Sequence, residues 1–74
     1  MIDDIKSRLA EHFPDGQIEV QSDGSHYAVQ IVSSAFDGLR PVRRQQLVYA
    51  AINDWIREGA LHAVNIKALT PDEQ

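Results

Sequence analysis

Cysteine is absent from this chain of 74 residues. The protein can therefore form neither a disulfide nor a thiolate nucleophile, and it cannot offer sulfur ligands to a metal. The sequence also lacks an apolar run close to the roughly 20 residues that a membrane-spanning helix needs. Its amphipathic, acidic beginning differs from a secretory signal, so we expect a cytoplasmic protein with no membrane association.

Positive charge is scarce as well. Seven lysines and arginines stand against eleven acids, which gives a net charge of −4. Because nucleic-acid binding depends largely on neutralising phosphates, the overall charge argues against it, and only a local basic cluster could hold DNA. The chain is also too short for two hydrophobic cores, so we treat residues 1–74 as one domain with a polar tail at 70–74.

Motifs for catalysis are missing. The sequence has no glycine-rich phosphate loop, no HExxH zinc motif and no nucleophile elbow. Its adjacent acids, Asp3 and Asp4, fall at a predicted helix start, where carboxylates are favourable for the helix dipole. We therefore expect a binding protein rather than an enzyme.

The first half of the chain predicts a helix and a hairpin. Apolar residues recur every three or four positions over 2–13, and Pro14 ends this helix. Alternation over 17–21 and a β-rich run over 27–32 then predict two strands. The polar turn between them, residues 22–25, is short enough to favour antiparallel pairing.

The second half predicts a helix and a last strand. Pro41 suits a first helical turn and Gly59 a helix end, while the polar, basic stretch 40–46 indicates a separate short turn before the main helix. Strand chemistry returns over 61–69. Residues at helical spacing predict that the apolar face includes Val42, Tyr49, Ile52 and Ile56.

The resulting order is αββααβ, an α+β domain with a three-stranded mixed sheet packed by helices. A strand, a crossover helix and a second strand usually form a right-handed parallel unit, so the last strand should run parallel to the second. Their starting ends then coincide. His26 begins one strand and His62 takes the second position of the other, so we expect two imidazoles to meet at one end of the sheet.

Two imidazoles would supply half of a four-coordinate site for iron, copper or zinc, and a partner or cofactor would have to supply the rest. The alternative is that His26 is a solvated loop residue and that His62 borders the core. The third histidine, His12, has no companion on its helix and is expected at the surface.

A second candidate site is basic. Guanidinium groups match phosphate and carboxylate oxygens, so a cluster at the start of the second helix could contact nucleic acid or an anionic partner. The alternative is a solvated helix start. The residues in question are Arg40, Arg43 and Arg44, with Lys67 nearby.

The predicted core is drawn from all five main elements. We expect an isolated monomer whose buried residues include Ile5, Leu9, Ile18, Val20, Val29, Ile31, Val48, Ile52, Val64 and Ile66.

Four segments in order resemble the BolA family, most closely its IbaG-like bacterial branch. They are DGSHY at 23–27, FDG at 36–38, VRRQQLVY at 42–49 and LHAVNIKALTP at 61–71. Each segment is a weak signal, but their order and spacing together are specific, and the resemblance extends over residues 18–73.

The resemblance implies a fold similar to the type II KH domain and a partner, a monothiol glutaredoxin. With that partner, BolA-like proteins can share a glutathione-ligated 2Fe-2S cluster, for which the resemblance implies His62 and His26 as this chain's ligands. No cofactor is expected in the isolated chain. An alternative role is transcriptional regulation through DNA, although the GxxG loop with which KH modules clamp RNA is absent.

Overall fold

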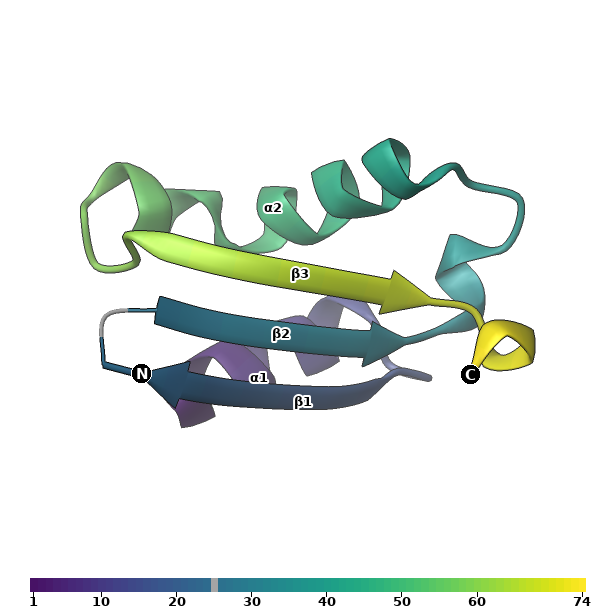
Figure 1. The fold of residues 1–74 in the computed structure, drawn as a ribbon, viewed down its shortest axis with the longest axis horizontal. Helices are drawn as coiled ribbons and strands as arrows, with labels where there is room; N and C mark the ends of the chain where they lie inside the picture. Colours follow the sequence, from purple (N-terminus) through teal and green to yellow (C-terminus); the bar gives the residue numbers. More distant parts are fainter. Residues whose placement is uncertain (25) are drawn as a thin grey trace.

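A computed structural model describes residues 1–24 and 26–74, in which two α-helices pack on a three-stranded sheet (Figure 1). The α+β class and the mixed sheet predicted from the sequence are confirmed. The elements are α1 (Ile2–His12), β1 (Gln17–Asp23), β2 (His26–Val32), the 3-10 turn η1 (Ser34–Phe36), α2 (Pro41–Arg57), β3 (Ala63–Leu69) and the 3-10 turn η2 (Pro71–Glu73).

Several predicted boundaries shift. β1 continues to Asp23, so only part of the predicted turn at 22–25 remains, and its Ser25 lies outside the described residues. α2 is unbroken from Pro41, so the stretch 40–46 forms no separate turn; the short helical turn before α2 is η1, which lies earlier, at Ser34–Phe36. Ser33 caps the start of η1, because its hydroxyl accepts a hydrogen bond from the amide of Ala35 at 3.1 Å.

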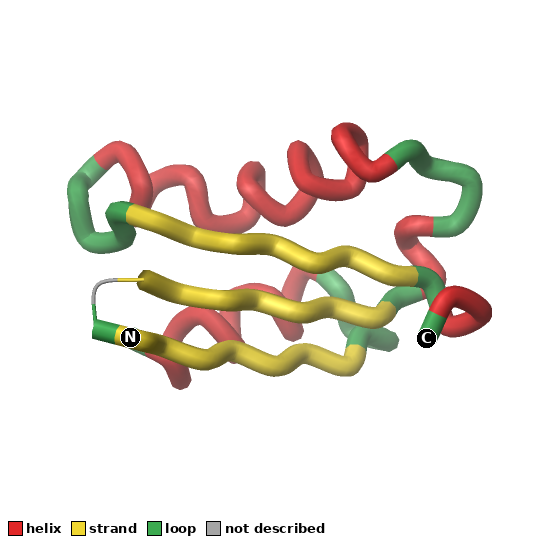
Figure 2. The backbone as a smooth tube through the Cα atoms, viewed as in Figure 1, coloured by secondary structure: helices red, strands yellow, loops and turns green. Residues whose placement is uncertain are grey.

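The strand order is β1-β2-β3. β1 pairs with β2 in antiparallel fashion, and β2 pairs with β3 in parallel, as the crossover argument predicted. Figure 2 shows α1 behind β1 and β2, and α2 running along β3. Neither helix of the described chain combines the length and the apolar character that a bilayer crossing would require.

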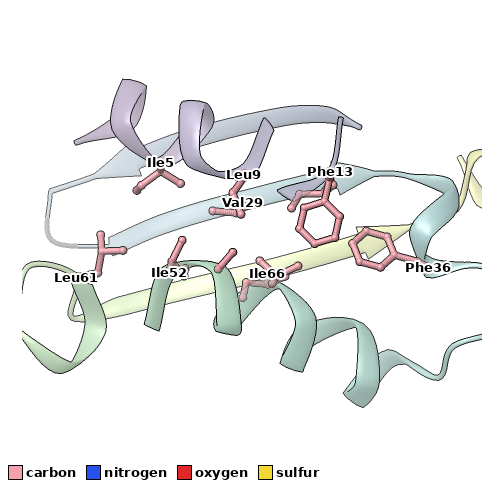
Figure 3. Close-up of a cluster of buried hydrophobic side chains, with 11 residues drawn as sticks. Ile5, Leu9, Phe13, Val29, Phe36, Ile52, Leu61 and Ile66 are labelled. Atoms are coloured by element: carbon pink, nitrogen blue, oxygen red, sulfur yellow. The ribbon is translucent and has the colours of Figure 1, made fainter. Parts of the chain in front are cut away.

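The core lies between the two helices and one face of the sheet (Figure 3). Seven of the ten predicted core residues are buried, and Ile18, Val20 and Val64 are partly buried against them. Phe36 and Leu61 are fully buried additions, since η1 before α2 and the segment after α2 fold back onto the core. The predicted apolar face of α2 is wrong at Val42 and Tyr49, which are 69% and 38% exposed.

Polar side chains fix the end of the sheet where β2 and β3 finish. Asp15, in the turn between α1 and β1, accepts hydrogen bonds from the Ser34 hydroxyl at 2.6 Å, the Ser33 hydroxyl at 2.8 Å and the Ser34 amide at 3.0 Å. These bonds, led by the Ser34 hydroxyl, lower the pKa of Asp15 to about 2. The α1–β1 turn is thereby tied to η1.

Arg44 makes a second tie at the same end. Its guanidinium pairs with the Glu73 carboxylate through Nη1 at 2.6 Å and Nη2 at 3.2 Å, and its Nε donates to the Leu39 carbonyl at 2.8 Å. Glu73 also accepts from the Thr70 amide at 2.8 Å. Arg44 first, and then Thr70, lower the pKa of Glu73 to about 2. The start of α2 is thus joined to the tail behind β3.

Candidate functional site

His26 is the first residue of β2, and it lies opposite Ala63, the first residue of β3. Its side chain is exposed. Because side chains alternate along a strand, His26 shares the open face of the sheet with its register partners Asp23 and Ala63. Both helices cover the other face, so this imidazole is accessible from outside the fold.

His62 is exposed and stands one residue before β3, not at the strand's second position as predicted. The reason is local: the amides of Ala60 and Leu61 both donate to the Trp55 carbonyl, at 2.9 and 3.2 Å, which prolongs the turn after α2. Leu61 then inserts into the core at 1% exposure. His62 is therefore held between the buried Leu61 and the start of β3.

Gly59 lies beside His62 in the turn after α2. Its φ of +81° is a left-handed conformation that favours glycine. A Cβ at Gly59 would lie 3.9 Å from Cε1 of His62, an ordinary van der Waals contact, so the glycine is required for its φ and not for space around the ring. The sequence predicted Gly59 only as a helix end.

The parallel register brings both histidines to one end of the sheet. His26 pairs with Ala63, the direct neighbour of His62. β2 and β3 begin at the same end of the sheet in Figure 1, as the crossover argument predicted. Within the described residues no group of three or more His, Cys, Asp or Glu is placed to hold a metal ion. Two exposed imidazoles at one end of the sheet are candidates for half of a metal or cluster site, whose remaining ligands would come from elsewhere.

A hollow of about 350 Å³ adjoins His26 on the open face of the sheet. It is lined by residues 21–23, 26–28 and 63–65. Small side chains at Ala28 and Ala63 account for its depth, and Asp23 and Asn65 give it polar walls. A partner group that reached His26 would have space there.

The predicted basic cluster is only partly available. Arg40, the residue before α2, and Arg43 are exposed, and Lys67 is exposed on the open face of β3. Arg44 is different, because its guanidinium is bound by Glu73, Leu39 and Ala68 and its side chain is only 11% exposed. Sequence spacing could not reveal this role, since Arg44 and Glu73 are 29 positions apart.

The family comparison gives one match that spans almost the whole chain. The model described as BolA-like protein matches residues 2–73. Among individual proteins, the chain is 40% identical over 70 residues to the acid stress protein IbaG of Escherichia coli K12, a match that covers 95% of this chain and 83% of that protein.

Solved structures agree with the sequence matches. The BolA domain of SufE1 from Arabidopsis thaliana superimposes with a TM-score of 0.88 at 34% identity, covering 99% of this chain and 94% of that one. BolA1 from the same plant gives a TM-score of 0.87 at 28% identity, with the same coverages. The resemblance read from the four short sequence segments is thereby confirmed.

Proposed function

This chain belongs to the BolA family, and we propose that it acts as a non-enzymatic adaptor for a cytosolic monothiol glutaredoxin. In the proposed complex the two proteins share a glutathione-ligated 2Fe-2S cluster, in cluster trafficking or in iron and redox sensing. His62 and His26 would be this chain's ligands. The observation that carries the proposal is the pairing of His26 with Ala63, which puts both exposed imidazoles at one end of the sheet.

The composition supports a shared site rather than a self-contained one. The chain has no cysteine, so any thiolate at the site must come from a partner or from glutathione. Imidazole and thiolate ligands are compatible on iron, and exchange of sulfur for nitrogen raises the reduction potential of a 2Fe-2S centre. When bound, the cluster would supply one-electron chemistry. In this proposal, the chain contributes two imidazole nitrogen ligands.

The two histidines should contribute unequally. His62 is fixed by the buried Leu61 on one side and by β3 on the other. His26 follows the hairpin turn that contains Gly24, whose φ is +67°. A ligand supported by a rigid element is better preorganised, so we expect His62 to contribute more than His26.

Mixing this protein with a cluster-loaded monothiol glutaredoxin tests the proposal. A heterodimer should form, with a visible absorption and circular dichroism spectrum that differs from that of the glutaredoxin homodimer, because nitrogen ligands alter the ligand-to-metal transitions. His62→Ala should abolish most of the change, and His26→Ala should reduce it. His12→Ala is the matched control, since His12 is exposed on α1 and belongs to neither candidate site.

A His26→Ala/His62→Ala double variant that folds and still gives the wild-type heterodimer spectrum would exclude both residues as ligands. Binding of DNA is the competing function, and it is tested by measuring the binding of duplex DNA and of a monothiol glutaredoxin side by side at near-physiological salt. Arg40 and Arg43 are the exposed cations at the start of α2. Tight, sequence-selective DNA binding that an Arg40→Ala/Arg43→Ala variant loses would favour a regulator over an adaptor.

A further inference from the structure

The two outer edges of the sheet can be compared group by group. The Ser33 amide donates to the Leu69 carbonyl at 2.9 Å, which fixes which residues of β2 bond to β3. Because the backbone groups of successive residues point to alternate sides of a strand, the register then determines which groups of β1 and β3 point away from the sheet. The backbone groups of Ile18, Val20 and Ser22 point outward from β1, and those of Val64, Ile66 and Ala68 point outward from β3.

We call the first set of outward groups the β1 edge and the second set the β3 edge. The β3 edge is partly occupied by α2. Arg44 Nη1 donates to the Ala68 carbonyl at 3.2 Å, and the Tyr49 hydroxyl makes a long hydrogen bond of 3.4 Å to the Val64 carbonyl. Side chains of α2 thus bind two of the three outward-pointing carbonyls of the β3 edge.

The β1 edge has no such protection. Within residues 1–24 and 26–74, no hydrogen bond from another element reaches the backbone of Ile18, Val20 or Ser22. All seven residues of β1 are exposed or half-buried, and the strand contains neither proline nor lysine, the residues that usually guard an edge. The β1 edge therefore presents a ready template for one more strand.

Charge identifies the occupant of this edge. Residues 1–24 hold six acids against two cations, whereas residues 25–74 hold five of each, so the whole net charge of −4 belongs to the segment that forms α1 and β1. Glu19 and Asp23 lie on the open face of β1 itself. Nucleic acid is repelled by such a surface, and a second copy of this chain would bring equal negative charge to it.

We infer that the β1 edge docks an extended, basic segment of a protein partner, which adds to the sheet as a fourth strand. Main-chain hydrogen bonds to Ile18, Val20 and Ser22 would provide affinity. Alternate lysine or arginine side chains beside Glu19 and Asp23 would provide selectivity. This surface goes beyond the adaptor role and involves neither histidine.

A capped heptapeptide that alternates lysine and valine is a suitable probe, added to the full chain and followed by NMR. The amides of Ile18, Val20 and Ser22 should become protected from hydrogen exchange, while the Ile66 amide on the β3 edge stays unchanged. A peptide with glutamate in place of lysine should not bind. Protection at neither edge, or equal binding of both peptides, would overturn the inference.

Two variant pairs separate backbone pairing from charge. Ser22→Pro removes one outward donor and should weaken peptide binding about 3- to 10-fold, whereas Ser22→Ala, which keeps the amide, should not. Glu19→Lys should weaken binding about 2- to 5-fold, whereas Glu58→Lys, with the same change in net charge but an exposed site after α2, should not.

The Glu19→Lys and Glu58→Lys variants still test the inference if Ser22→Pro fails to fold, because neither lysine substitution alters the backbone. Sedimentation of the free protein tests the other possible occupant of the β1 edge, a second copy of this chain. Concentration-dependent dimers that Ser22→Pro abolishes would show that a second copy, and not a basic segment, fills the β1 edge, and this result would overturn the inference.

Discussion

Where β2 and β3 finish, side chains from distant segments hold the structure together: Asp15 binds Ser33 and Ser34, and Arg44 binds Glu73. Where the same strands begin, the described residues place two exposed histidines next to turns that contain Gly24 and Gly59. We refer to the two as the tethered end and the histidine end. They lie at opposite ends of the sheet in Figure 1.

The difference separates stability from binding within a small domain. Buried groups and paired charges at the tethered end restrict motion there, so the remaining side chains need not be fixed for the fold to persist. The histidine end is then free to present polar groups to a partner. Substitutions at the histidine end should therefore change partner binding strongly and the free energy of unfolding little.

Truncation of Phe36 should have the largest effect on stability, because it removes buried contacts within the tethered end. Its ring is fully buried, with its centroid 5.2 Å from that of Phe13. Phe36→Ala should lower the free energy of unfolding by about 3–5 kcal/mol, measured by urea denaturation. Val42→Ala, at an exposed site, should change it by less than about 0.5 kcal/mol. Similar losses for both variants would show that Phe36 does not anchor this end.

Acid should loosen the tethered end next. The folded pKa values of Asp15 and Glu73 are lowered to about 2 from 3.8 and 4.5, so the folded state binds fewer protons than the unfolded state in this range. Their contribution is complete above about pH 5 and is lost as the pH falls toward 2. Urea midpoints should decrease over that window.

An Asp15→Asn/Glu73→Gln variant checks the origin of this pH dependence. It should be less stable at neutral pH, and its urea midpoint should change less between pH 5 and pH 2. Glu19→Gln is the control, since Glu19 lies in β1 and takes no part in the tethers. An unchanged slope in the double variant would assign the acid response to other carboxylates.

The histidine end should give the smallest effect on stability. Because both imidazoles are exposed, His26→Ala and His62→Ala should each change the free energy of unfolding by less than about 0.5 kcal/mol. The same variants are the ones expected to alter the spectrum of the glutaredoxin complex. A loss above about 1 kcal/mol for either variant would mean that the histidine end also supports the fold.

Local sequence patterns predicted the elements that depend on near neighbours. The apolar stripe of α1, the alternation in β1 and the β-rich run of β2 all have a period that a short window reveals. The handedness of crossover connections then gave the parallel pairing of β3, and with it the shared end for His26 and His62.

The tethers were not predictable in the same way. Asp15 and Ser34 are 19 positions apart, and Arg44 and Glu73 are 29 apart, and no spacing rule connects such polar residues. Phe36 ends the three-residue turn η1 and Leu61 lies between α2 and β3, so neither has a periodic pattern that would mark it as buried. The exact start of β3 depended on that hidden anchor, which is why His62 lies one residue outside the strand.

The partly occupied β3 edge also limits how copies of this protein can assemble. An endless fibril needs each sheet to offer two complementary edges, so that one copy's β1 edge meets the next copy's β3 edge. Arg44 and Tyr49 already bind carbonyls of the β3 edge. Two copies that met through their β1 edges would form a closed pair flanked by partly occupied edges, and the like negative charge of the two β1 strands opposes even this pair. Growth by strand addition would stop at two, which protects a concentrated solution of this small domain from fibrillar aggregation.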